Sequence, residues 1–179
     1  LMRLEHPSIP RVMRRIVSAD GAYVDLLRPY VVGIPLGEEL DEGPADQLAA
    51  LAQLEEVLRI LEYLHGRTPP MIHGSLEFNQ VVRRAVDGAL LLHGLGPWRV
   101  PRVGSPCLPP EHGSGPATVA GDLYAAGVLT LGALRGDFPE GLHDGGILEL
   151  SVPEDIHPEV VELLVGLLLG RGKLASGDL

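Results

Sequence analysis

The sequence predicts an α+β protein that is mainly helical. Three features support this class. Two pairs of short apolar segments each flank an Asp-Gly dipeptide, one stretch of about twenty residues repeats leucine at helical spacing, and a later stretch is apolar on nearly every face. Asp-Gly between apolar runs is typical of β-hairpins, whereas apolar residues three and four positions apart indicate helices. The chain of 179 residues is long enough for one well-formed core.

The small β part is predicted to consist of two hairpins. The first comprises residues 12–27 and turns at Asp20-Gly21, and the second comprises residues 80–94 and turns at Asp87-Gly88. Glycine suits such turns because it adopts positive φ angles without steric cost.

Between the hairpins, the leucine spacing predicts a helix over about residues 45–65. One face carries Leu51, Leu54, Leu58 and Leu61, and the expected solvent side carries Gln53, Glu55, Arg59 and Glu62. Gly66 and the pair Pro69-Pro70 are expected to end the helix.

The second half of the chain is predicted to contain two more helices. Residues 97–117 are rich in Pro and Gly and predict an irregular loop. Residues 122–136 are apolar on nearly every face, which is typical of a helix at the centre of a helical layer. A final helix over about 157–169 is expected to turn Glu159 and Glu162 toward solvent.

The composition disfavours several functional classes. The formal charge of −10 argues against binding to nucleic acid or to an anionic membrane. The apolar run over residues 160–170 contains Glu162 and is too short to insert across a bilayer. Cys107 is the only cysteine, which favours a reducing compartment, and we expect a cytoplasmic protein.

Five segments in this order resemble the C-terminal lobe of a Ser/Thr protein kinase. They are LEHPSIPRV (4–12), VDLLRPYVVGIPL (24–36), LRILEYLHGRTPPMIHGSLEFNQVV (58–82), GSPCLPPEH (104–112) and DLYAAGVLTLGALRG (122–136). By this resemblance, residues 1–36 are a remnant of the small lobe, with a helix end, a β-hairpin and the hinge. Residues 37–179 are then the kinase-like C-lobe.

The catalytic-loop segment departs from the kinase pattern H-R-D-L-x-x-x-N. Gly74 replaces the Arg, and Ser75 replaces the Asp that orients the substrate hydroxyl. Glu77 stands where these kinases usually place a Lys, and a carboxylate there repels phosphate. Gln80 replaces the Asn that binds magnesium, unless the loop slips by one and Asn79 is the equivalent.

The metal-binding triplet D-F-G is also altered. Its counterpart is Gly94-Leu95-Gly96, or, with a shift of one residue, His93 stands in the place of Asp. Neither alignment supplies the carboxylate that magnesium prefers. We therefore expect no bound metal or other cofactor.

Residues with architectural roles in the family are retained. His73 and Leu95 match the hydrophobic regulatory spine, and Asp122 matches the buried acid that anchors the catalytic-loop backbone. Glu111 matches a Glu that usually pairs with an Arg near the end of the lobe, with Lys173 or Arg171 as partner candidates. These matches predict a preserved framework.

The resemblance also suggests a remnant of the nucleotide pocket. Arg28 would lie beside the hinge, where its bulk and charge obstruct a nucleotide, and Val82 would form the pocket floor or pack in the core. Binding of ATP is therefore not expected. The histidines His73, His93 and His112 match no metal-ligand spacing, so hydrogen bonding is their simpler role.

Taken with the resemblance, these losses predict a catalytically inactive pseudokinase that acts as a protein-binding scaffold or allosteric regulator of a protein partner. The alternative is an atypical phospho- or nucleotidyl transferase, in which Glu77, Asn79 and Asp87 are the nearby metal-capable oxygens. A third possibility is a remnant lobe that only supports neighbouring domains.

Overall fold

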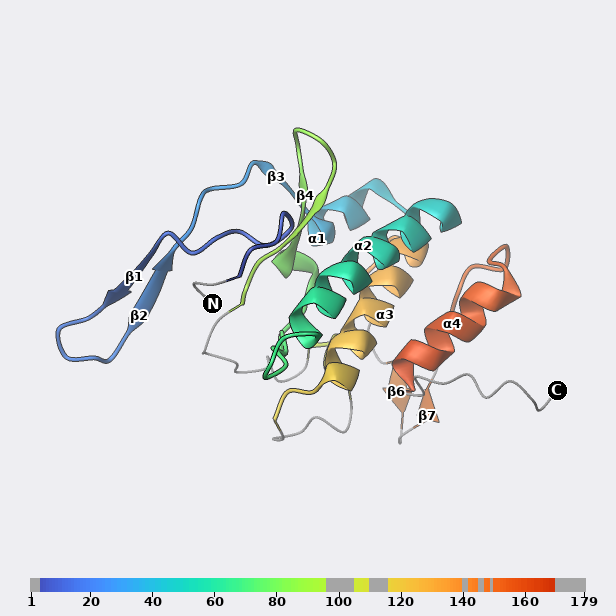
Figure 1. Ribbon diagram of the computed structural model, residues 1–179. Helices are drawn as coiled ribbons and strands as arrows, with labels where there is room; N and C mark the ends of the chain where they lie inside the picture. The colour runs from blue at the N-terminus through green and yellow to red at the C-terminus, as the bar shows by residue number, and fades with distance from the viewer. Residues whose placement is uncertain are drawn as a thin grey trace.

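Three helices form the body of the protein in a computed structural model, which describes residues 4–95, 105–109, 116–139, 142–144, 147–148 and 150–169. These helices are α2 (Gln47–His65), α3 (Val119–Arg135) and α4 (Pro158–Leu168). Helix α3 contacts both α2 and α4, and all three lie side by side in Figure 1. The α+β, mainly helical class predicted from the sequence is confirmed.

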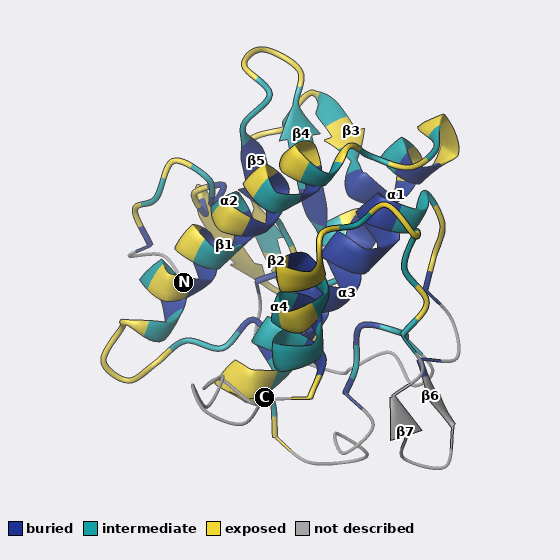
Figure 2. Cartoon of the chain, turned by 90° about the vertical axis from the view of Figure 1, so that its right-hand side faces the viewer, coloured by how far each residue is buried: buried dark blue, intermediate teal, exposed yellow. Residues whose placement is uncertain are grey.

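Helix α2 begins two residues later than predicted and ends at the predicted position. The Asp46 carboxylate caps its first turn by accepting hydrogen bonds from the amides of Leu48 and Ala49. After His65 the chain leaves the helix at Gly66, whose N–H bonds back to Glu62 O at 2.9 Å. The solvent side of α2 points outward in Figure 2, and its other side packs on the core.

Helix α3 is buried along most of its length, as its uniformly apolar sequence predicts. It begins at Val119, three residues before the predicted start, because the Thr118 hydroxyl accepts a hydrogen bond from the Gly121 amide and caps the helix. It ends at Arg135, followed by Gly136 with φ = 70°. Figure 2 shows α3 as a largely buried element between the other helices.

The strands form three small antiparallel sheets. Strands β1 (Arg14–Val17) and β2 (Val24–Leu27) pair only with each other and form a ribbon that projects from the body in Figure 1. Strands β3 (Gly33–Pro35), β4 (Val81–Arg84) and β5 (Leu90–Leu92) form the second sheet in that order. Strands β6 (His143–Asp144) and β7 (Ile147–Leu148) form the third.

Both predicted hairpins are present. In the first, the Val17–Val24 pair closes the ladder, and the connection is longer than a two-residue turn. In the second, β4 and β5 flank the turn at Asp87 and Gly88. The sequence did not predict β3, nor three short helical segments: α1 (Leu36–Glu39), η1 (Leu40–Glu42) and η2 (Phe78–Gln80).

The expectation that residues 4–12 contain the end of a helix is wrong. This segment holds a turn and an isolated bridge between His6 and Ile9. Pro7 and Pro10 lack the backbone N–H that helical hydrogen bonds require. The segment instead covers the edge of β5, where the Leu92 amide donates to Ser8 O at 2.8 Å.

The predicted exposure of Gln53 on α2 is also wrong, because its side chain is buried. Its Oε1 atom accepts a hydrogen bond from Arg83 of β4 at 3.2 Å. Burial of the amide is tolerated because this polar partner replaces water. The predicted exposure of Glu159 and Glu162 on α4 is confirmed.

One apolar core joins the helices to the second sheet. Its fully buried side chains include Leu61 and Leu64 of α2, Val81 of β4, Leu129 of α3 and Leu164 of α4. Burial of each such side chain contributes roughly 1.5–3 kcal/mol. Within the described residues, none of the helices combines the length and the apolar character needed to cross a membrane.

Candidate functional site

The candidate site is centred on the loop of residues 73–80, which the buried side chain of Asp122 holds in place. Asp122 lies in the first turn of α3 and is 1% exposed. Its Oδ2 atom accepts the His73 amide at 2.8 Å, and its Oδ1 atom accepts the Gly74 amide at 2.7 Å. Two backbone donors to one carboxylate fix the course of the loop. This is the type of contact that the resemblance implied for Asp122.

A third group bonded to Asp122 was not foreseen from the sequence. The Nε2 atom of His65, the last residue of α2, lies 2.8 Å from Asp122 Oδ2. The two residues are 57 positions apart, and no motif links them. The carboxylate therefore connects the end of α2, the loop and the start of α3.

The His73 ring adds a second anchor to the loop and is buried. Its Nδ1 atom accepts the Ser75 amide at 3.3 Å, and its Nε2 atom lies 2.7 Å from His93 O. A nitrogen that accepts a hydrogen bond from an amide carries no proton, so we assign the proton to Nε2, which donates to the carbonyl. His73 thus links the loop to the segment after β5.

Ser75, which the kinase resemblance places at the position of the catalytic Asp, lies in a narrow space. Gly74 has φ = 71°, a conformation that glycine adopts readily and other residues only at a cost. The half-buried Ser75 borders a cavity of about 10 Å³, together with Cys107 and Pro109. That volume holds about one water molecule.

Gln80 and Asn79 point to different elements. A Cβ atom at Gly94 would collide with Gln80 Oε1, whereas one at Gly37 of α1 would lie 2.6 Å from Asn79 Oδ1. Gln80, and not Asn79, is therefore the side chain that lies against Gly94. The backbones are also joined, because the His93 amide donates to Gln80 O at 2.7 Å.

Arg28 bridges the ribbon and the segment after β5. Its guanidinium donates a hydrogen bond to the carbonyl of Leu95, which is buried. Arg28 and Leu95, with residues 24–26 and Gly94, line a cleft of about 400 Å³. Partial burial lowers the pKa of Arg28. Val82 does not line this cleft; it pairs with Pro35 and Leu91 in the second sheet.

His93 lies beside this cleft and has no carboxylate partner in the described part of the chain. Burial, and to a lesser extent the charge of Arg28, lower the pKa of His93. Its Nε2 atom is buried, and no hydrogen-bond partner is found for it among the described residues. A neutral imidazole is thus favoured here.

The charge of Glu77, a residue of the loop, acts on the Cys107 thiol. Burial, and to a lesser extent the nearby charge of Glu77, raise the pKa of the Cys107 thiol to about 12. The thiol is therefore protonated and not reactive. Cys107 is buried.

The described residues contain no group of three or more His, Cys, Asp or Glu side chains arranged to hold a metal ion. Five residues for which the sequence predicted or weighed a role lie outside the described residues: Gly96, Glu111, His112, Arg171 and Lys173. The described part of the site offers several hydrogen-bonding groups. The Asp122 carboxylate is occupied by loop backbone and His65.

Comparison with known proteins gives a distant relationship. No family model matches the chain. The chain is similar to "Serine/threonine-protein kinase B" of Synechocystis sp. (strain ATCC 27184 / PCC 6803 / Kazusa), with 27% identity over 155 residues that cover 75% of this chain. The chain spans about a quarter of that relative's length (26%). The similarity indicates a kinase-like relationship.

Proposed function

We propose that this chain is a non-catalytic, kinase-like binding module, a pseudokinase that acts as a scaffold or allosteric regulator of a protein partner in the cytoplasm. In this proposal the C-lobe spans residues 37–179, and residues 1–36 belong to the small lobe. The module binds no metal or other cofactor, and Arg28 disfavours ATP in the adjoining cleft.

One observation carries the proposal. The loop is held in a defined conformation by Asp122 and His73, while by the kinase resemblance the places that handle phosphate hold Ser75, Gln80 and Gly94 or His93. A hydroxyl, an amide and an imidazole do not provide the carboxylates that bind magnesium and accept the substrate proton. The framework is thus retained without the groups needed for phosphoryl transfer.

A phosphotransfer assay tests this function. We expect autophosphorylation and phosphorylation of generic protein acceptors to stay at background with ATP and either magnesium or manganese. Ser75→Ala and Gln80→Ala should change nothing in this assay. Activity above background that either substitution abolishes would overturn the proposal.

A second candidate is an atypical phospho- or nucleotidyl transferase. It is supported by the similarity to a serine/threonine-protein kinase and by the cleft of about 400 Å³ beside Gly94 and Leu95. Of its three candidate oxygen ligands, Asp87 is paired with Arg84 at 2.7 Å and Asn79 faces Gly37. These two therefore point toward other partners, which leaves Glu77 as the remaining candidate.

Nucleotide binding separates the two candidates. A transferase should show a concentration-dependent rise in melting temperature with ATP and a divalent metal, because ligand binding stabilises the folded state by mass action. The pseudokinase proposal expects no shift up to millimolar ATP. Arg28→Met is the informative variant, since it removes the charge that we expect to obstruct the cleft.

A further inference from the structure

A second cavity, of about 390 Å³, is lined by residues of α1, η1, α2 and β4. Its apolar walls come from Leu36 of α1, Leu40 of η1, Phe78 of η2 and Leu129 of α3. Small-molecule sites usually enclose about 300–1,000 Å³ and are mostly apolar with a few polar groups. The cavity meets this description, and neither the kinase resemblance nor the proposed function assigns it a role.

The cavity is open because of the small residues on one stripe of α2. Ala49, Ala52, Gln53 and Glu56 lie three and four positions apart, so they share one face of the helix, and all four line the cavity. Ala49 and Ala52 are exposed, and a larger side chain at either place would occupy the space. The cavity is thus accessible from solvent.

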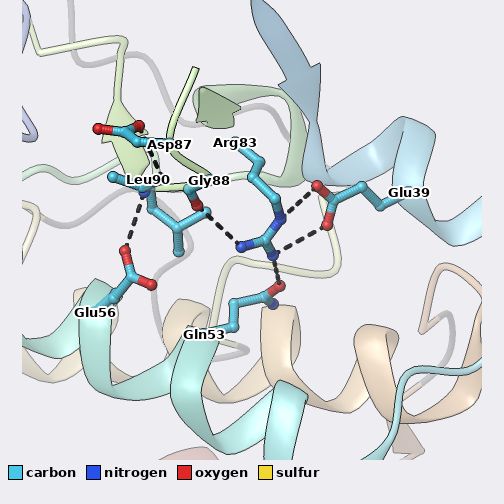
Figure 3. A network of polar contacts seen from close by, with 8 residues as sticks. Glu39, Gln53, Glu56, Arg83, Asp87, Gly88 and Leu90 are labelled. Carbon is cyan, nitrogen blue, oxygen red and sulfur yellow. Dashed lines mark hydrogen bonds and ion pairs between the residues drawn. The ribbon is translucent and has the colours of Figure 1, made fainter. Parts of the chain in front are cut away.

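Arg83, the arginine that lines the cavity, is already hydrogen-bonded to other residues of the chain. Arg83 of β4 donates to both carboxylate oxygens of Glu39, at 2.7 and 3.1 Å, to Gln53 Oε1 at 3.2 Å and to Gly88 O at 3.4 Å. These bonds use four of the five N–H donors of the guanidinium and are visible in Figure 3. Arg83 is therefore poorly placed to bind an anionic ligand.

Glu56 supplies a carboxylate without a cationic partner among the described residues. Its Oε2 atom accepts the Leu90 amide at 3.0 Å, which orients the side chain from α2 toward β5, as Figure 3 shows. Glu39 and Glu56 against Arg83 leave the cavity with one net negative charge. The short helices α1 and η1, which supply part of the lining, also carry Glu38, Asp41 and Glu42.

We propose that this cavity is a binding site for a small organic cation, an amine on a compact apolar body. The apolar part contacts Leu36, Leu40 and Phe78, and the ammonium group pairs with the Glu56 carboxylate. This assignment follows from the juxtaposition of an apolar, open cavity with a carboxylate that has no cationic partner among the described residues and with an arginine that is already occupied. It is independent of the proposed function.

A chemical-shift titration of the isotope-labelled chain tests the site with three probes of similar shape. They are 2-phenylethylamine, which is cationic at pH 7, neutral 2-phenylethanol and anionic 3-phenylpropanoate. We expect saturable shifts in the backbone amides of residues 36–43 and 49–56. The amine should bind about fivefold more tightly than the alcohol, the size of effect typical for a partly exposed ion pair, and the anion should bind most weakly.

Two variants separate charge from shape. Glu56→Gln keeps an oxygen acceptor for the Leu90 amide but removes the charge, so the amine should lose its advantage over the alcohol. Ala52→Leu fills the cavity and should abolish binding of all three probes. If Ala52→Leu disturbs the fold, Ala49→Leu replaces it.

Matched controls lie on exposed helical positions outside the cavity. Glu62→Gln on α2 and Ala120→Leu on α3 should leave the titrations unchanged. The proposal is wrong if no saturable shift occurs up to about 10 mM amine, if the three probes bind equally, or if binding persists in the cavity-filling variants.

Discussion

At the scale of single residues, the Asp122 carboxylate is the group that we expect to stabilise the candidate site most among the described side chains. It is almost fully buried and is bonded to the amides of His73 and Gly74 and to the ring of His65. In Asp122→Asn, one oxygen becomes an NH₂ donor that faces another donor. We expect a loss of about 3 kcal/mol in the free energy of unfolding, since breaking a buried, charge-assisted cluster costs about this much.

Urea denaturation measures this loss. The matched control is Asp137→Asn, because the Asp137 carboxylate pairs with Arg135 while more than half exposed. The control should change stability by less than about 0.5 kcal/mol. Equal losses in the two variants would contradict a special role for Asp122.

The Cys107 thiol offers a second test at this scale. Its pKa is raised from 9.0 to about 12 by burial and by Glu77, which reduces the thiolate fraction near pH 8 about a thousandfold. The direction is the important point: alkylation becomes faster only as the pH rises toward 12. Iodoacetamide at pH 8 should therefore modify the native chain very slowly and the urea-unfolded chain at an ordinary rate. Rapid modification of native protein would contradict the buried position.

At the scale of elements, the sequence predicted what local patterns determine. Leucine spacing placed α2, an unbroken apolar run placed α3, and two Asp-Gly pairs placed the hairpins. It failed where tertiary contacts decide the conformation. Strand β3 has three residues and forms because β4 pairs with it, and α1 and η2 are too short to show a helical period.

Close packing between α3 and η2 explains a glycine in the middle of a buried helix. A Cβ atom on Gly132 would lie 2.5 Å from Phe78 Cζ, and the Phe78 ring is held edge-on by Phe138, with centroids 5.1 Å apart. Gly132→Ala gains about 1 kcal/mol in helix propensity but costs about 1–3 kcal/mol through overpacking. We expect a net loss of about 1 kcal/mol in urea denaturation.

A double-mutant cycle identifies the clash as the cause. In the Phe78→Leu background the ring is absent, so Gly132→Ala should become neutral or stabilising there. The same loss in both backgrounds would show that Phe78 is not responsible.

At the scale of the whole molecule, the candidate site was only partly predictable. The sequence pointed to His73, Ser75, Gln80 and Asp122 because they lie in or near recognisable local segments. It gave no signal for the bonds from His65 to Asp122 or from Arg28 to Leu95, which join residues 57 and 67 positions apart. Such pairs depend on how α2, α3 and the ribbon are placed, which no short spacing encodes.

The ribbon of β1 and β2 is expected to open independently of the helical body. All four residues of β1 are exposed, and the two strands pair only with each other, an arrangement that is marginally stable by itself. The hydrogen bond from Arg28 to Leu95 ties the ribbon to the rest of the molecule. Ribbon amides should therefore exchange with deuterium through local opening, whereas amides of α3 should exchange only through global unfolding.

Substitution of Arg28, whose hydrogen bond ties the ribbon to the body, tests whether the ribbon opens independently of the helices. Loss of one hydrogen bond in Arg28→Met should speed exchange of the ribbon amides about fivefold and leave α3 unchanged. Arg15→Met is the matched control, because Arg15 is exposed on the same ribbon, and it should have little effect. If ribbon and α3 amides exchange at the same slow rate, the ribbon belongs to the cooperative core. The Arg28 contact would then be one of many that hold it there.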